Sequence, residues 1–159
     1  MKKIALVLLA LMLAVGCAAA QELPFDAVRY ELEDWGFSIC LPEDWLEIEL
    51  TDEDEEDGVI FCAMSPEGEH GMSIIFTDME MELDTQALVE ALEDSYSGVS
   101  VEEINDIEFV AATSAEDDSN LLCTVGASGQ SVFMFIFTPA SDRDFVSTSI
   151  AIAGSIDTL

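Results

Sequence analysis

The residues in this sequence best suited to chemistry are six consecutive carboxylates at positions 52 to 57, which precede Gly58. An EF-hand calcium loop places acids at its first, third and fifth positions, glycine at the sixth and glutamate at the twelfth. If Asp52 is the first position, the acids fit but the twelfth position is Ala63. If Glu53 is the first position, Gly58 falls at the sixth but the twelfth is Met64. We therefore interpret the run as a solvated loop whose like charges repel one another. The alternative is a loose calcium site formed by Asp52, Asp54, Glu56 and Asp57.

Side chains suited to catalysis are few. Two carboxylates facing each other across a cleft would suffice for a small hydrolase, but the acids here fall mostly in turns and on strand exteriors. The single histidine, His70, lies in a turn, and the segment GASG at 126–129 is one residue short of a nucleophile elbow. No lysine follows Lys3, which excludes a lysine Schiff base and a GxxxxGK phosphate loop. We expect a non-catalytic protein, and a carboxylate-dependent hydrolase is the alternative.

Beyond Cys17 the sequence has three widely spaced cysteines, Cys40, Cys62 and Cys123, with no CxxC pair. This spacing is not that of a disulfide framework. Each lies in an apolar run, where a free cysteine behaves as a small hydrophobic residue. A single bridge between Cys40 and Cys62 across neighbouring strands is the alternative, so the sequence leaves the redox state of the three thiols open.

Trp35 and Trp45 flank the first strand pair expected from the sequence, and Trp35 falls at its turn. An exposed tryptophan can bind a sugar or a protein partner. The more ordinary role of such a residue is to cap the core. Trp35 is thus a candidate partner-binding residue, with the core-capping role as the leading interpretation.

The charge of the chain is strongly one-sided, with 34 acidic residues against four basic ones and a net charge of −30. A surface of this sign repels nucleic acid and anionic lipid. It favours solubility, condensation of cations or a basic partner. We therefore expect no nucleic-acid partner and no direct docking to a membrane surface.

The apolar pattern divides the chain into strands and two helices. A period of two predicts strands, and a 3.6-residue period after Asp84 predicts a helix that ends near Gly98. A terminal helix opening at Ser141 is also predicted, although its β-branched content suits a strand equally. The strands are expected at 28–33, 37–41, 45–50, 59–64, 72–76, 107–113, 120–126 and 131–138, and the helices at 84–98 and 141–156.

The segment SVFMFIFT at 131–138 is apolar on both faces. A strand of this kind belongs at the centre of a sheet and needs cover above and below. An antiparallel sheet with one inserted helix and one terminal helix therefore predicts an α+β fold in which helices cover both faces of a mainly antiparallel sheet.

The segments GFSICLPEDW (36–45) and FMFIFTP (133–139), together with the middle helix and a terminal helix closing on GSI (154–156), resemble the PsbP-like family. The resemblance covers about residues 28 to 157 and implies a three-layer α/β/α sandwich. The family includes photosystem extrinsic proteins, a nuclear-transport factor and many bacterial lipoproteins. It therefore implies a binding or accessory module more than an enzyme, although a fold does not fix a function.

The first 17 residues, MKKIALVLLALMLAVGC, have the layout of a secretory signal. Two lysines precede the apolar stretch Ile4 to Val15, which is too short to span a bilayer. The residues AVGC at 14–17 resemble the lipobox of bacterial lipoproteins, although Ala14 stands where that family usually has leucine. The resemblance implies lipidation at Cys17 and anchoring to a membrane outside the cytoplasm. Cleavage after Ala20, which would release a freely secreted protein, is the alternative.

These patterns predict a signal peptide at 1–16, a lipid-anchored tether at 17–27 and a single PsbP-like domain at 28–159. The expected function is that of a non-catalytic extracytoplasmic lipoprotein, which presents an acidic surface to a protein or cell-wall partner. No cofactor is expected apart from calcium in the alternative of a cation-binding module at 52–57. The identity of the partner, the envelope type of the host and the oligomeric state do not follow from the sequence.

Overall fold

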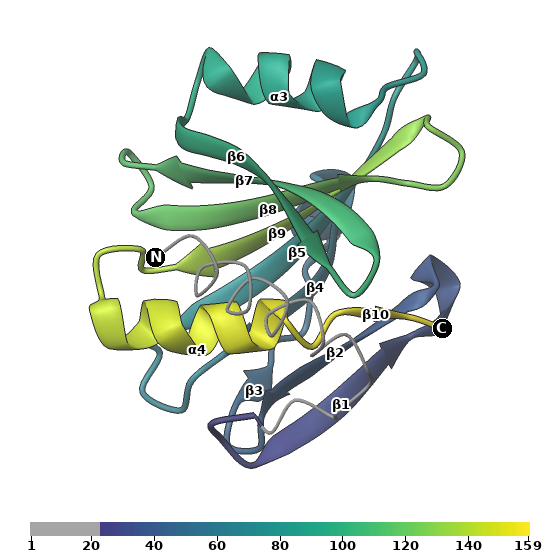
Figure 1. The fold of residues 1–159 in the computed structure, drawn as a ribbon. Coiled ribbons are helices and arrows are strands. Elements are labelled where there is room, and N and C mark those ends of the chain that lie inside the picture. Colours follow the sequence, from purple (N-terminus) through teal and green to yellow (C-terminus); the bar gives the residue numbers. More distant parts are fainter. Residues whose placement is uncertain (1–22) are drawn as a thin grey trace, which may run out of the picture.

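The computed structural model describes residues 23–159, so the predicted signal peptide and Cys17 lie outside the described residues. The described chain forms a mixed α+β fold with two antiparallel sheets and few helices (Figure 1). The elements are β1 (Ala27–Leu32), the 3-10 helix η1 (Glu33–Trp35), β2 (Phe37–Pro42), β3 (Leu46–Glu47), α2 (Asp52–Glu56), β4 (Val59–Met64), β5 (Gly71–Asp78), α3 (Thr85–Glu93), β6 (Ser97–Ile104), β7 (Ile107–Ser114), β8 (Ser119–Val125), β9 (Ser131–Thr138), α4 (Arg143–Ala153) and β10 (Asp157–Thr158).

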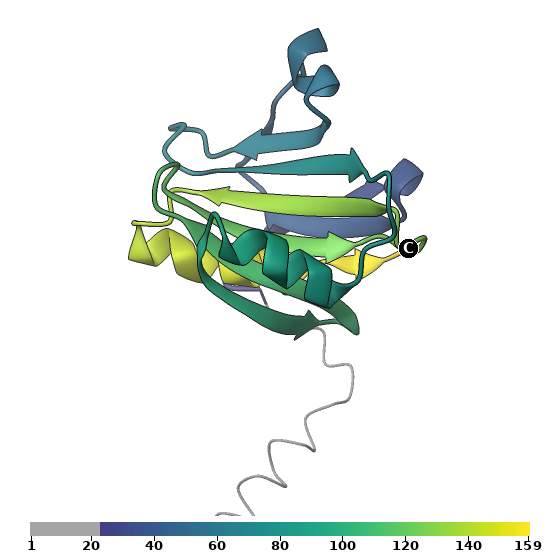
Figure 2. The ribbon, with the colours of Figure 1, turned by 90° about the horizontal axis from the view of Figure 1, so that it is seen from above.

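The larger sheet has seven strands in the order β3-β4-β5-β9-β8-β7-β6. The first hairpin does not join it, because β2 pairs with β1 on one side and with β10 near the C-terminus on the other, in a separate three-stranded sheet. The two views show α3 and α4 as separate helices, with α4 running into β10 (Figures 1 and 2).

Strand β9 lies at the centre of the larger sheet and pairs along its whole length with β5. Its two faces belong to different core clusters. Phe133, Phe135 and Phe137 contribute to one, and Val132, Met134 and Ile136 contribute to the other. The prediction of a central strand over 131–138 that is buried on both faces is confirmed.

The first cluster lies between the larger sheet, the small sheet and α4. Ile39 and Leu41 of β2 and Phe145 and Ile152 of α4 are buried in it with the phenylalanines of the larger sheet. Burial of one such large side chain contributes about 1.5–3 kcal/mol. The prediction that helices cover both faces of the sheet is therefore not confirmed, because the small sheet, together with α4, covers this face.

The second cluster lies between α3 and the opposite face of the larger sheet. Leu88 and Leu92, one helical turn apart, pack with Val110, Leu121 and Cys123 of the strands. Asp84 caps this helix by accepting a hydrogen bond from the backbone N–H of Ala87 at 2.8 Å. The sequence predicts either Asp84 or Thr85 as this cap, and in the structure it is Asp84.

The helix predicted over 84–98 is too long. Helix α3 ends at Glu93, and Gly98, with a φ of 65°, already belongs to strand β6. The sequence pattern missed β6 because most of its side chains are exposed and polar, as suits the edge of a sheet. The strand predicted over 45–50 is also too long, since β3 contains only Leu46 and Glu47.

The predicted terminal helix is confirmed as α4, but its N-cap is Asp142 and not Ser141. The carboxylate of Asp142 accepts hydrogen bonds from the backbone N–H groups of Asp144 and Phe145, at 2.9 and 3.2 Å. Ser141 instead contacts Asp118, with its hydroxyl donating at 2.6 Å. Both residue types favour helix caps, so tertiary contacts decided between them.

Candidate binding groove

A groove of about 650 Å³ lies between α4 and strands β6, β7 and β8. It opens on the face of the larger sheet that carries the first core cluster. Its volume is in the range of ordinary ligand sites. A second concave site on the described chain is smaller, about 430 Å³, and lies beside the turn after β7.

The floor of the groove is formed by strand residues that share one face of the sheet. Ala111 of β7 pairs with Leu122 of β8, and Leu122 pairs with the core residue Phe135. Thr113 pairs with Asn120, and their side chains form a hydrogen bond of 3.1 Å. Directly paired residues point to the same face, so small and apolar side chains form most of the floor.

Helix α4 forms one wall of the groove. Val146 and Ile150, four residues apart and therefore on one side of the helix, face the groove together with Ser149 and Ala153. Ser149 and Ala153 are buried, whereas 66% of Ile150 is exposed. Of the apolar side chains on this wall, Ile150 is the one that the described residues leave largely exposed.

Asn105 closes one end of the groove. Its side-chain amide donates to the carbonyl oxygens of Gly154 at 3.1 Å and of Ile156 at 2.7 Å. The two turn residues between β6 and β7, Asn105 and Asp106, both have positive φ angles, of 50° and 63°, which asparagine and aspartate tolerate better than most residues. The turn is therefore tied to the end of α4, and the groove has a fixed end.

The rim formed by β6, across the groove from α4, is acidic. Glu102 of β6 pairs with the core residue Phe109 and points to the groove face, where the hydroxyl of Ser100 donates to it at 3.0 Å. Glu103 also lines the groove, but it pairs with Glu108 and its side chain points to the opposite face of the sheet. The lining contains no lysine, arginine or histidine. Both carboxylates lie on one strand, and α4 contributes none to the facing wall. The groove therefore combines an apolar floor and wall with a rim suited to a cation.

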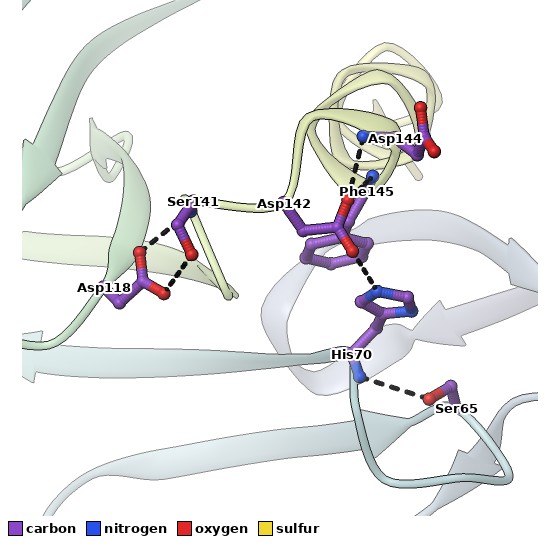
Figure 3. Close-up of polar contacts among 7 residues, drawn as sticks. All are labelled: Ser65, His70, Asp118, Ser141, Asp142, Asp144 and Phe145. Carbon is purple, nitrogen blue, oxygen red and sulfur yellow. Dashed lines mark hydrogen bonds and ion pairs between the residues drawn. The ribbon is translucent and has the colours of Figure 1, made fainter.

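The start of α4 is held by His70 (Figure 3). The Nε2 atom of His70 lies 3.0 Å from the carboxylate of Asp142, and its ring stacks on Phe145 with centroids 4.6 Å apart. Trp45 stacks on the same phenylalanine at 6.0 Å. The hydrogen bonds from His70 and from the backbone of α4 lower the pKa of Asp142. This cluster fixes the helix that forms the wall.

The same histidine is not part of a nucleophilic triad among the described residues. Ser65 is its nearest hydroxyl partner, and that hydroxyl accepts from the backbone N–H of His70 at 3.2 Å instead of bonding to the ring (Figure 3). Sequence reasoning left His70 in a plain turn, because its partner Asp142 is 72 residues further along the chain.

The acidic run at 52–57 forms the short helix α2 and not the open loop predicted. Thr51 caps it, and Asp54 returns the interaction by accepting from the backbone N–H of Thr51 at 2.8 Å. The hydroxyl of Thr51 also donates to this carboxylate at 2.7 Å, and the hydrogen bonds from the hydroxyl and from the backbone N–H of Thr51 lower the pKa of Asp54. Within residues 23–159 there is no group of three or more His, Cys, Asp or Glu side chains placed to hold a metal ion. The candidate ligands Asp52, Asp54, Glu56 and Asp57 are therefore neighbours along α2 but do not form such a group.

Trp35, the candidate partner contact, lies in η1 and is half-buried. Its ring packs against Phe76 with centroids 4.6 Å apart and against Phe133 at 6.2 Å. These contacts at the edge of the first cluster agree with the core-capping interpretation.

Cys40, Cys62 and Cys123 are free thiols. The alternative of a bridge between Cys40 and Cys62 is wrong for this structure, because Cys40 belongs to the small sheet and Cys62 to the larger one. Burial raises the pKa of Cys123 to about 12. These thiols are therefore packing residues.

The groove itself was not predicted from the sequence. Two of its acids, Glu102 and Glu103, lie on the strand that the apolar pattern missed. The only signal was the alternation of Val99 and Val101 with polar neighbours after Gly98. That alternation would have predicted a strand, but not its position opposite α4.

No protein-family model and no curated protein matches the chain. Solved structures do match its fold. The solution structure of cyanobacterial PsbP (CyanoP) from Synechocystis sp. PCC 6803 superimposes with a TM-score of 0.62 at 12% identity, over 92% of this chain and 99% of that one. A crystal structure from Bacteroides thetaiotaomicron VPI-5482 has a TM-score of 0.54 at 18% identity, over 82% of this chain and 48% of that one. The chain thus spans about half the length of the second structure. The first similarity shows a PsbP-like fold, in agreement with the predicted resemblance.

Proposed function

We propose that this protein is a non-catalytic binding or accessory module, built as a PsbP-like three-layer sandwich and held at the outer side of a membrane by a lipid on Cys17. It presents an acidic surface, with the groove beside α4 as its contact site, to a basic protein or cell-wall partner. The mechanism is recognition by charge and apolar contact, without bond making or breaking.

The observation that supports this proposal most strongly is the composition of the groove. Mostly apolar side chains form its floor and one wall, the carboxylate of Glu102 lies at its rim, and its lining contains no basic residue. The whole chain carries a net charge of −30. Charges of one sign around a cleft steer oppositely charged partners to it and disfavour partners of the same sign.

A hydrolase finds less support. Glycosidase-type catalysis needs two carboxyl groups on opposite sides of the substrate, whereas Glu102 and Glu103 are consecutive on one strand. Neither glutamate is buried, whereas the general acid of such an enzyme lies in an apolar pocket. We therefore favour binding over catalysis at this site.

The location rests on the sequence of the first 17 residues. Among the described residues, none of the helices has the length and apolar character needed to cross a bilayer. A lipid on Cys17 would supply the anchor, and the following tether would separate the domain from the membrane. Anchoring of this kind needs more than one acyl chain for stable attachment.

The anchor is tested by expressing the full chain in a bacterium that is fed an alkyne fatty acid. We expect label on the wild-type protein in the membrane fraction and none on a Cys17→Ser variant. Globomycin, which blocks the lipoprotein signal peptidase, should cause the precursor to accumulate. Unlabelled wild-type protein in the culture medium would refute the anchor.

The acidic-surface part of the proposal is tested with fluorescein-labelled oligolysine. We expect binding that weakens steeply with added salt, because exposed charges are screened over about 8 Å at physiological ionic strength. Oligoglutamate of the same length is the matched control and should not bind. Equal behaviour of the two peptides would exclude a basic partner.

A further inference from the structure

We infer that the groove beside α4 receives a cationic amphipathic helix from a protein partner, which lies on the sheet next to α4 with a basic side chain toward Glu102. This inference rests on the proposed function and specifies the partner's contact segment. It is carried by the dimensions of the groove, by the uncovered flank of α4 and by the charge of the rim.

The width of the uncovered floor fits one helix. Strands β6, β7 and β8 are consecutive neighbours in the larger sheet, and strands lie about 4.8 Å apart, so the three span about 10 Å. This is close to the 10–12 Å diameter of a helix with its side chains. Helix α4 already packs on this face of the sheet through Phe145 and Ile152. A bound helix would therefore pack on the sheet beside α4 in the same way.

The length of the groove fits about two helical turns. Its wall runs along α4 from Val146 to Gly154, which corresponds to about 12 Å at 1.5 Å per residue. Asn105 blocks the end near Gly154. An occupant helix therefore contacts the groove over two turns, with apolar residues at positions i, i+3, i+4 and i+7.

The uncovered flank of α4 supplies the ridge against which such a helix packs. Val146 and Ile150 follow the i, i+4 spacing that forms a ridge on a helix surface. Ile150 is 66% exposed although it lies on the groove side of an otherwise well-packed helix. The small floor residues Ala111 and Thr113 allow a close approach of the occupant.

The rim decides the charge of the occupant. Glu102 lies on the side of the groove opposite α4 with its side chain on the groove face, and the lining has no basic residue to pair with it. An anionic helix, or a lipid with an anionic headgroup, would be repelled by this rim and by the net charge of −30. A helix with lysine or arginine beside its apolar face is complementary both to the acidic rim and to the apolar floor and wall.

The test uses a fluorescein-labelled helical peptide with leucine at i, i+3, i+4 and i+7 and lysine on the flanks of that face. Three matched peptides replace every lysine by glutamine, replace every lysine by glutamate, or scramble the order of the lysine peptide. Binding to the purified protein is followed by fluorescence anisotropy, and helix formation by circular dichroism. We expect only the lysine peptide to bind tightly, with a gain of helix content.

Two substitutions of matched exposure locate the site. Ile150→Lys changes the wall, whereas Met81→Lys adds the same charge at a residue that is 64% exposed and outside the groove lining. We expect Ile150→Lys to weaken binding about tenfold or more and Met81→Lys about twofold or less, because buried central contacts dominate binding and distant charges act weakly. Replacing Glu102 by glutamine should weaken binding about threefold and reduce its salt dependence, whereas Glu103→Gln, on the opposite face of the sheet, should change binding less. Thermal melts check that every variant is folded.

The possible results separate this inference from the proposed function. Equal binding of the lysine peptide to wild type, Ile150→Lys and Met81→Lys would overturn the groove as the site, while the acidic-surface function would stand. Equal binding of the glutamine and lysine peptides would overturn the cationic specificity. Failure of both the lysine peptide and oligolysine to bind would overturn the inference and the basic partner together.

Discussion

Replacement of Phe135 by alanine tests whether the two-sided strand β9 organises the fold. Phe135 is 1% exposed, and its ring makes edge-to-face contacts with Phe37 at 5.4 Å and Phe109 at 5.9 Å between ring centroids. These partners come from the small sheet and from the larger sheet, so one side chain joins the two layers. Its removal should therefore weaken the packing between the layers, and not only within one sheet.

The expected cost is about 3–5 kcal/mol, which is typical for a buried phenylalanine replaced by alanine. Urea unfolding followed by circular dichroism measures it. With a slope of about 2 kcal/mol per molar urea, the midpoint should fall by about 2 M. Because the total stability of a domain is about 5–15 kcal/mol, Phe135→Leu serves as a milder variant that keeps the protein folded, with a smaller loss expected.

Ile150→Ala is the control, because that side chain is 66% exposed and should change the free energy of unfolding by no more than about 0.5 kcal/mol. A double-mutant cycle with Phe37→Ala should show coupling to Phe135 of about 0.5–3 kcal/mol, since the two rings are in contact. A loss below about 1 kcal/mol for Phe135→Ala would refute the reasoning. It would mean that the layers are held together elsewhere.

Three further predictions follow from the titratable groups. The lowered pKa of Asp142 means that its hydrogen bonds favour the charged carboxylate. Its contribution to stability is therefore present above the usual pKa of aspartate and is lost as the pH falls through the lowered value. Melting temperatures of wild type and Asp142→Asn should converge toward low pH. Burial raises the pKa of Cys123 to about 12, so this thiol should resist iodoacetamide at pH 8 until urea unfolds the protein. Cys62 is half-buried, and its pKa is raised by burial and then by Asp54, so it should react slowly in the folded state. Mass spectrometry can follow the alkylation of both thiols. Millimolar calcium should raise the melting temperature no more than sodium at matched ionic strength, because Asp54 is bonded to the cap of α2.

Each of these predictions has a clear contrary outcome. A stability difference between wild type and Asp142→Asn that persists unchanged into strong acid would show that the charge of Asp142 is not what stabilises the start of α4. Rapid alkylation of Cys123 in the folded protein would contradict its position in the second cluster. A calcium-specific rise in melting temperature would restore the acidic run as a cation site.

The sequence by itself determined the elements that have a strong local pattern. The strand at 131–138, the start of the helix at Asp84 and the terminal helix after residue 141 were all predictable, because apolar periodicity and capping chemistry act over a few residues. The resemblance of the chain to PsbP-like proteins added the layered fold, which the CyanoP structure supports.

Tertiary structure alone decided the features that depend on distant partners. The edge strand β6 carries mostly polar side chains, and the sequence pattern left it unassigned apart from its first two residues, which fell within the predicted helix, because the strand is established by its pairing with β7. The separation of β1 and β2 into a second sheet depends on β10, more than 100 residues away. His70 and Asp142, 72 residues apart, meet only because the turn after β4 lies beside the start of α4.

The candidate site belongs wholly to this second class. Its floor, wall and rim come from four elements, and no two of them show in the sequence that they will face each other. Local patterns record which residues avoid water, but not which buried surface is left partly uncovered when the layers close. The part left uncovered depends on how many helices and strands are available to cover the sheet, and here it is the strip of β6, β7 and β8 beside α4.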